Sequence, residues 1–497
     1  MKKFKFLFSL TVILGVLLFA SCDDEDSIVA FDKPAVSAPS EVAEIPFGSK
    51  GQSVDFSVSI DADLTASYSA TGTNVTVLNG SGSVTGNTVT INYDAGANAG
   101  AASITLKVTD SEGQTDDATF VISVGQPEFE LKVTGNITQN TTWTSDKVYI
   151  LGGRITVVDG VTLTIEPGTI IKGEAGTGAN ATALLVARGG KLLAEGTSEK
   201  PIIFTSVADE ISSDDIVAGN FGSPNLDPDI DGLWGGVLVL GKAPVSASNE
   251  SGDISEIQIE GIPTSDQNGL YGGSEPGDNS GVLKYISIRH GGTNIGSGNE
   301  INGLTLGGVG SGTVIENIEV IANQDDGIEW FGGTVNVKNA LVWNVNDDAI
   351  DTDQSWAGTL DNFVIIAPGD HNFELDGPEG SMEAGHVIQN GTVIANDPSS
   401  GRFSSDLINT DDNSIVDLKN IYFTAIEEGQ KINRVVHNAG TVNFEGIQLN
   451  VPEAGLANYV NGEVPQGVTA VSTPTVGADV SVFGWTWAAK AGKLAGL

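Results

Sequence analysis

NIEVI at 317–321 returns as NALVW at 339–343, NFVII at 362–366, NGTVI at 390–394 and NIYFT at 420–424. Each stretch places an asparagine before a short apolar run, and the asparagines recur at intervals of 22, 23, 28 and 30 residues. A repeat of this length predicts stacked coils of short strands, in which each turn asparagine hydrogen-bonds its copy on the next coil. Helical periodicity is nearly absent, and a leucine-rich solenoid would need a repeating leucine frame that we do not find. The sequence therefore predicts a parallel β-helix over residues 127–455, followed by a C-terminal cap at 456–497.

Residues 33–126 show a different pattern, with apolar and polar residues alternating as in SVDFSVSI (53–60) and ASITLKVTD (102–110). Turn signals such as NGSG (79–82) separate these runs, which predicts an antiparallel β-sandwich. This segment resembles the bacterial immunoglobulin-like modules that act as stalks, and we expect it to be a spacer. The β-helical part resembles the pectin-lyase-like superfamily, which implies a right-handed coil. The predicted fold class is all-β, an immunoglobulin-like sandwich followed by a right-handed parallel β-helix.

The N-terminus has the layout of an export signal. Lysines at positions 2, 3 and 5 precede an apolar run at 6–19, and Cys22 is the only cysteine of the chain. This pattern predicts a lipoprotein signal peptide at 1–21, a lipidated Cys22 and an acidic tether at 22–32. DDED at 23–26 resembles the acidic export signal of surface-exposed lipoproteins of the Bacteroidetes group. We expect an outer-membrane lipoprotein that is displayed on the surface; an ordinary cleavage site, or an anchor that faces the periplasm, is the alternative.

The charge of the chain limits its partners. The 497 residues carry a formal net charge of −41, although only 18% of them are charged. Such a charge repels nucleic acid and attracts divalent cations. With four histidines and one cysteine, zinc and redox metals are disfavoured and calcium is the expected ion.

Three consecutive coils are strongly acidic: DDGIEWFGG from 325, DDAIDTDQS from 347 and DHNFELDGP from 370. Because side chains alternate along a strand, their carboxylates are expected to point outward in rows, about 4.8 Å apart from coil to coil. Carboxylates this close must protonate, move apart or share a cation. Strands disfavour acidic residues, so these rows predict a site. The expected binding residues of the rows are Glu329, Asp351, Asp353, Glu374 and Asp376.

The same coils resemble the polygalacturonase-type glycoside hydrolases, which carry Asn-Thr-Asp, then an Asp pair, then a His, then Arg-x-Lys on successive coils. The matching stretches here are Asn323-Gln324-Asp325, Asp347-Asp348, His371 and Arg402-Phe403-Ser404. They depart from the family pattern at three points: Gln replaces the Thr, no Gly follows the His, and Ser replaces the Lys.

This resemblance implies catalytic roles for five residues. Asp348 would be the general acid, and Asp325 and Asp347 would activate a water molecule. His371 would support the site, and Arg402 would hold a carboxylate of the substrate. A calcium-dependent lyase, with a base such as Arg289 on the face of the helix, is a less favoured enzymatic alternative.

A second metal signal is DPDIDG at 227–232, which places Asp227, Asp229 and Asp231 around a turn as in calcium loops. The twelfth position is Leu238 rather than the usual Glu, so the loop would need other ligands, and a solvated loop without an ion is the alternative.

Taken together, these signals predict a surface lipoprotein whose acidic, calcium-loaded face binds an anionic polysaccharide or another extracellular glycan. Trp356 and Trp343 are expected to stack on sugar rings. The alternatives are a polysaccharide hydrolase acting at the same face, and an accessory subunit of an outer-membrane uptake or secretion complex.

Overall fold

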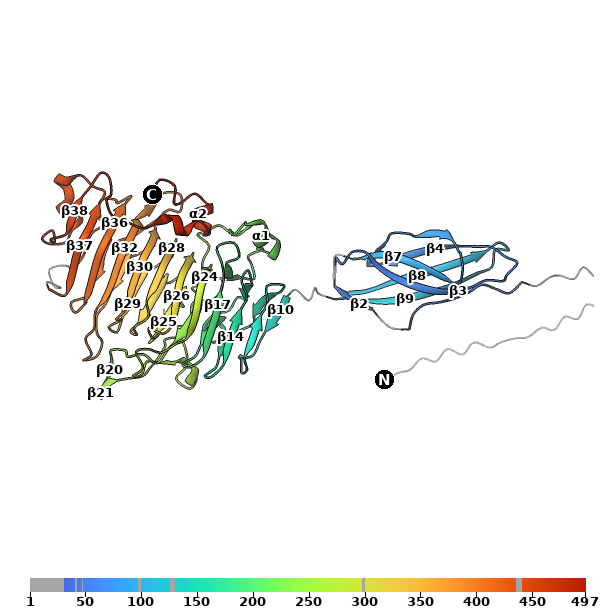
Figure 1. Cartoon of the computed structure of the whole chain (residues 1–497), viewed down its shortest axis with the longest axis horizontal. Helices are drawn as coiled ribbons and strands as arrows, with labels where there is room; N and C mark the ends of the chain where they lie inside the picture. Colours follow the sequence, from blue (N-terminus) through green and yellow to red (C-terminus); the bar gives the residue numbers. More distant parts are fainter. Residues whose placement is uncertain are drawn as a thin grey trace, which may run out of the picture. The chain divides into compact units, whose positions relative to one another are not determined.

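The structure, a computed structural model, describes residues 31–40, 43–46, 48–96, 100–125, 130–296, 300–434 and 440–497. The signal peptide, Cys22 and most of the tether lie outside these residues. The chain divides into two compact units, Met1–Pro127 and Glu128–Leu497 (Figure 1). In the described part, every helix is too short or too polar to span a bilayer.

The first unit is a β-sandwich of two sheets, as predicted. Inward residues alternate with exposed ones, and Phe56, Ile91, Ile104 and Leu106 fill the space between the sheets. All strand pairs are antiparallel except β2 with β9. One sheet contains β1 (Ala35–Ser37), β3 (Gln52–Ser59), β7 (Thr88–Ala95) and β5 (Val75–Val77), and the other contains β2 (Ala43–Pro46), β9 (Thr115–Gly125), β8 (Gly100–Asp110), β4 (Ala66–Thr73) and β6 (Ser81–Ser83).

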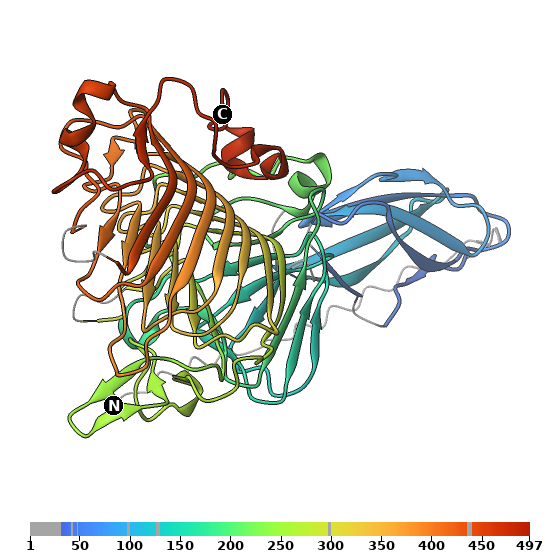
Figure 2. The same ribbon diagram turned by 60° about the vertical axis from the view of Figure 1, so that its left-hand side comes forward.

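The second unit is a parallel β-helix, and its parallel sheets fit the right-handed coil that the sequence predicts (Figures 1 and 2). A long sheet contains β10 (Glu130–Val133), β12 (Val148–Leu151), β15 (Ile170–Gly173), β18 (Ile202–Ser206), β24 (Gly281–Arg289), β26 (Val314–Ile321), β28 (Val337–Trp343), β30 (Thr359–Ile366), β32 (His386–Ile394), β36 (Val416–Thr424), β37 (Val442–Leu449) and β38 (Val468–Ala470), with β11 (Thr141–Trp143), β14 (Thr162–Ile165) and β17 (Lys191–Glu195) beside its first coils. A second sheet contains β13 (Arg154–Val157), β16 (Ala183–Val186), β19 (Val237–Leu240), β25 (Leu304–Gly307), β27 (Ile328–Phe331), β29 (Ile350–Asp353), β31 (Phe373–Leu375) and β35 (Asn409–Thr410).

The recurring asparagines bend the long strands. Asn317, Asn339, Asn362, Asn390 and Asn420 all have φ between 54° and 61°, a left-handed conformation that asparagine tolerates better than most residues. Their amides form the predicted ladder: Asn339 donates to Asn317 at 2.9 Å, Asn362 to Asn339 at 2.8 Å, and Asn420 to Asn390 at 3.1 Å. The ladder is interrupted between Asn362 and Asn390: the Asn390 amide donates to Asp361 at 2.7 Å, and the Asn362 Oδ1 accepts the backbone N–H of Asp479.

The C-terminal residues only partly match the expected cap. The segment η3 (Glu453–Tyr459) and strand β38 lie on the last coil. In contrast, η4 (Val480–Phe483) and α2 (Trp487–Lys490) lie along the side of the β-helix, where Phe483 and Trp487 cover Trp343 and Ile366 (Figure 1).

A long insertion between β19 and β24 covers part of the second sheet. Its Val245, Ile259 and Tyr271 pack on the outward side chains of Leu185 and Leu238. The insertion therefore covers the early coils of the second sheet, and its Ser246 and Tyr271 also hydrogen-bond Gln354 beside the acidic coils. Its elements are β20 (Ala247–Asn249), β21 (Gly252–Ile254), β22 (Ile257–Gln258), η2 (Gln267–Gly269) and β23 (Leu270–Tyr271); other short elements are η1 (Gly178–Asn180), α1 (Ser213–Ala218), β33 (Asn396–Asp397) and β34 (Arg402–Phe403).

Candidate functional site

The outer surface of the second sheet changes from apolar to acidic along the β-helix. Leu238 is in register with Thr305, which is followed on successive strands by Glu329, Asp351 and Glu374. The structure therefore places the three acidic residues in one row, as expected. Asn409 continues the row on β35. We call this surface, with the acidic turns beside it, the acidic face.

A second row of carboxylates lies at the far end of the same strands. Asp353 follows Asp351 on β29, and Asp376 follows β31, where its backbone N–H donates to Thr352 at 2.7 Å. Burial, together with the charge of Asp376, raises the pKa of Asp353 to about 7. Burial and the nearby Asp411 likewise raise the pKa of Asp376 to about 7. Both groups are therefore partly protonated near neutral pH.

The turns that precede the strands bring Asp325 and Asp347 together. Carboxylate oxygens of Asp325, Asp326 and Asp347 lie within 4.8 Å of one another. Burial, followed by the charge of Asp347, raises the pKa of Asp325 to about 7. Asp347 is exposed, so this pair opens to solvent.

Asp326 and Asp348 hold neighbouring turns together through hydrogen bonds to backbone N–H groups of the next coil. An Asp326 oxygen accepts the backbone N–H of Asp348 at 2.9 Å, and an Asp348 oxygen accepts the backbone N–H of His371 at 2.6 Å. The His371 Nδ1 lies 2.9 Å from the same Asp348 oxygen. Asp348 is only 3% exposed and one of its oxygens is bound to His371, which argues against the expected role of general acid.

His371 is a cation at the edge of the acidic face. Burial lowers the pKa of His371, but the hydrogen bond to Asp348 and the charges of Asp348 and Asp370 outweigh burial and raise the pKa to about 9. Its Nε2 lies 2.9 Å from the Nδ2 of Asn409, whose Oδ1 has no partner in the described part of the chain. Exchanging the two ends of that amide would let a protonated His371 donate to the Asn409 oxygen.

The deepest group consists of Asp326, Glu329 and Asp351, whose carboxylate oxygens all lie within 4.8 Å of one another. Burial, and then neighbouring carboxylates, raise the pKa of each far above its ordinary value. Asn302 donates to Glu329, and its own Oδ1 is buried without a partner among the described residues. Such a set of oxygen atoms suits a hard divalent cation such as calcium. Either protons or a bound cation must neutralise the charge of these three carboxylates.

Arg402 does not take the expected role of holding a substrate carboxylate. Its guanidinium pairs with Asp231 at 2.6 Å and also donates to the backbone carbonyls of Asp229 and Asn344. The prediction for Arg402 is wrong because its guanidinium is already paired with a carboxylate of the protein itself.

The same ion pair argues against the predicted calcium loop. Among the described residues, three groups of metal-ligating side chains come within 4.8 Å of one another, and Asp227, Asp229 and Asp231 belong to none of them. Arg402 supplies the positive charge next to Asp231 that a calcium ion would have supplied.

The tryptophans expected to stack on sugars are buried. Trp356 stacks on Trp330 with ring centroids 4.6 Å apart and donates from Nε1 to the Val335 carbonyl at 3.0 Å. Gln354 and Ser355, with φ of 53° and 58°, turn the chain so that Trp356 points inward. Trp343 is covered by Trp487. The expectation that either ring meets a ligand is wrong.

Arg289, considered as a lyase base, is also buried. It lies on β24 of the long sheet, and Trp487 covers its guanidinium at 5.0 Å. It cannot reach a ligand on the acidic face.

The sequence analysis missed several residues that border the acidic face. Asn302, Glu260 and Glu300 come from the insertion and from the loop before β25, and they line one small cavity beside Thr305. The charges of Glu260 and Glu300 contribute to the raised pKa of Asp325. These residues belong to no repeat, so no periodic signal could have located them.

The fold and the acidic face define a parallel β-helix protein with a carboxylate-lined surface on one sheet. The model of the pectate-lyase-like β-helix domain matches residues 135–488, and the chain belongs to this family. A search of the curated proteins finds no match.

Three solved structures are distantly similar. The catalytic unit of a thermostable GH87 α-1,3-glucanase from Streptomyces thermodiastaticus is 12% identical, covers 86% of this chain and 84% of its own, and gives a TM-score of 0.29. A family 28 exopolygalacturonase from Yersinia enterocolitica is 11% identical, with 88% and 98% covered and a TM-score of 0.16. A lipoprotein from Bacteroides thetaiotaomicron is 13% identical, with 21% and 90% covered and a TM-score of 0.16. Likenesses this distant carry no information about activity.

Proposed function

We propose that the acidic face holds a divalent cation, calcium, and binds an extracellular polysaccharide through it. The observation that carries the proposal is the buried group Asp326, Glu329 and Asp351, whose oxygens lie within 4.8 Å of one another. A calcium ion takes six to eight oxygen ligands, so a site of three carboxylates leaves positions for oxygens of a sugar.

The ligand we favour is an anionic polysaccharide such as a polyuronate. Without a cation, the rows of Glu329, Asp351 and Glu374 offer such a polyanion no positive charge. With the cation bound, a uronate carboxylate completes the coordination, because the cation attracts it and screens it from the carboxylates of the face. The N-terminal sandwich would serve as a spacer, and a lipid on Cys22 would anchor the protein to the outer membrane with the acidic face outside the cell.

The test is a calorimetric titration of the chain from residue 27 onward, first with calcium and then with polygalacturonate. We expect calcium binding that Asp351→Asn weakens at least about tenfold, and polygalacturonate binding that a chelator abolishes. Glu374→Gln should weaken polysaccharide binding, whereas the matched control Glu195→Gln, on the exposed surface of the long sheet, should not. Equal binding of polygalacturonate with and without chelator would contradict the proposal.

Hydrolysis is the second candidate, and the pair Asp325 and Asp347 favours it. Their oxygens approach within 4.8 Å, near the roughly 5 Å separation of retaining glycosidases. A pKa of about 7 lets Asp325 carry a proton at neutral pH, as a general acid must. New reducing ends that disappear in Asp347→Asn, but persist in Asp159→Asn at another exposed turn, would establish an enzyme.

A further inference from the structure

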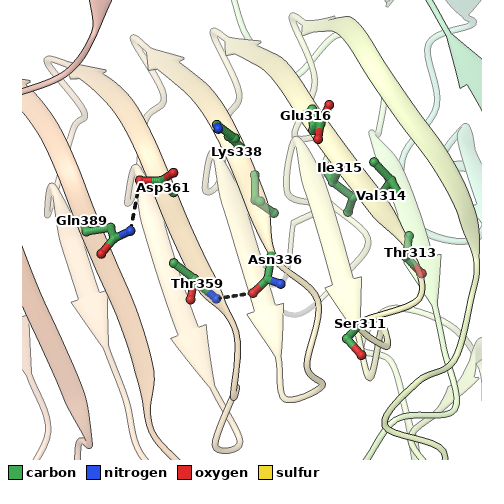
Figure 3. A pocket seen from close by; sticks show the side chains of 11 residues that line it. Ser311, Thr313, Val314, Ile315, Glu316, Asn336, Lys338, Thr359, Asp361 and Gln389 are labelled. Carbon is green, nitrogen blue, oxygen red and sulfur yellow. Dashed lines mark hydrogen bonds between the residues drawn. The ribbon is translucent and has the colours of Figure 1, made fainter.

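A groove of about 440 Å³ lies on another surface of the β-helix, across the outer face of β26, β28, β30 and β32 (Figure 3). One row of its side chains carries charged and amide groups, and we call it the long row because most of its members are Glu, Lys or Gln. The row two residues earlier, which we call the short row, is uncharged. The long row is Glu316, Lys338, Asp361 and Gln389, and the short row is Val314, Asn336 and Thr359.

The long row alternates in charge from coil to coil. Lys284 is in register with Glu316, and the two form an ion pair at 3.2 Å. Asp361 accepts hydrogen bonds from Gln389 at 3.2 Å and from Asn390 at 2.7 Å. The charges of Lys284, Glu316, Lys338 and Asp361 therefore balance, although the chain as a whole carries −41.

Lys338 is the exception in this row. It lies between Glu316 and Asp361 in the register and is exposed. Within the described ranges it forms neither an ion pair nor a hydrogen bond, since its two acidic neighbours are engaged elsewhere. If the row served only to stabilise the sheet, cross-strand pairing of Lys338 would be expected. Its ammonium group is instead available to a ligand.

We propose that this groove binds a neutral, hydroxyl-rich polysaccharide laid across the strands. Coils repeat every ~4.8 Å, close to the length of one sugar unit in an extended chain, so each successive sugar can meet the side chains of the next coil. The amide, carboxylate, hydroxyl and ammonium groups both donate and accept, as sugar hydroxyls require. Balanced charge favours neither a polyanion nor a polycation. The proposal does not depend on the acidic face.

A second copy of the chain is the competing occupant. A row of alternating charges on one copy can form ion pairs with the same row on another copy that runs in the opposite direction. The centre of the groove, at Asn336 and Thr359, is polar, unlike the apolar centre of homodimer interfaces. The half-exposed Val282, Val314 and Val387 of the same row lie on the strands to either side of this centre. The observations therefore favour the sugar chain.

The test is affinity electrophoresis of the soluble full chain through gels that contain a β-glucan, an α-glucan or a galactomannan. Thr359→Trp fills the groove and should weaken binding of the retained polysaccharide about tenfold, and Lys338→Ala should weaken it severalfold. Thr164→Trp is the matched control, because Thr164 is also half-buried and belongs to the same row of side chains on β14, outside the groove. It should bind like the wild type.

Two results would overturn the proposal directly. In the first, none of the neutral polysaccharides retards the chain in the gel. In the second, Thr164→Trp weakens polysaccharide binding as much as Thr359→Trp does. Weakening by Glu374→Gln would move the neutral glycan to the acidic face. A dimer that Lys338→Ala dissociates, seen by light scattering, would make the groove a contact between copies instead.

Discussion

Burial raises the pKa of Asp325, Asp348, Asp353 and Asp376 to about 7, against an ordinary value of 3.8. Between these values the folded protein binds more protons than the unfolded chain, so the free energy of unfolding falls as pH rises. His371 acts in the same direction. Its raised pKa of about 9 gives stability that is present below 6.5 and is lost as pH rises through 9.

We therefore predict that, in the presence of a chelator, the Tm is higher at about pH 5 than at about pH 7.5. Calcium should raise the Tm more at the higher pH, because it replaces protons in the carboxylate groups. Differential scanning calorimetry at both pH values measures this. Combining Asp353→Asn with Asp376→Asn should flatten the pH dependence, and an unchanged pH dependence would contradict the raised pKa values of these two groups.

Trp356 illustrates how an aromatic residue in an acidic segment can belong to the core. Replacing it with Ala removes its stacking on Trp330 and opens a cavity, which should cost about 3–5 kcal/mol of unfolding free energy. Denaturant unfolding measures the loss. Trp356→Phe keeps part of the packing and should lose less. A mutant with native stability but weakened glycan binding would restore Trp356 as a ligand contact.

At the scale of the structural element, the asparagine ladder explains why the long strands bend at the same point on each coil. Asn339 both donates to Asn317 and accepts from Asn362, and its φ is 57°. Asn339→Ala loses both hydrogen bonds and strains the backbone, which should cost about 2–4 kcal/mol. Asn339→Gly keeps the conformation and should cost less. Equal losses in the two variants, measured by denaturant unfolding, would show that the left-handed conformation adds no strain.

The acidic rows also arise at this scale. The acidic coils start 22 and 23 residues apart, and each coil adds one strand to the second sheet. The extra residue of the longer coil falls between β29 and β30, so the strands stay in register and Glu329, Asp351 and Glu374 keep the same outward position. A slip of one residue within a strand would turn them into the core.

For the whole molecule, the division into two units has a measurable consequence. Each unit has its own hydrophobic core, one around Phe56 and Ile104 and the other along the β-helix. We predict that the chain from residue 128 onward unfolds at the same temperature as the β-helix transition of the longer chain. Calorimetry of both forms tests this, and a large drop in Tm of the shorter form would show that the units stabilise each other.

The sequence by itself determined the two-part fold, the coil repeat, the asparagine ladder and the register of the carboxylate rows. All of these follow from local alternation repeated at a nearly constant interval, so the position of each residue is set by its distance from its copy on the previous coil. Three features could be seen only in the folded protein: the burial of Trp356, the pairing of Arg402 with Asp231, and the small cavity lined by Glu260 and Glu300. Arg402 and Asp231 are 171 residues apart and lie in segments without a repeat, Arg402 on the short strand β34 and Asp231 in a loop. Whether a charge in such a loop meets a ligand or a protein partner depends on how nonperiodic segments pack, and no pattern along the chain encodes that contact.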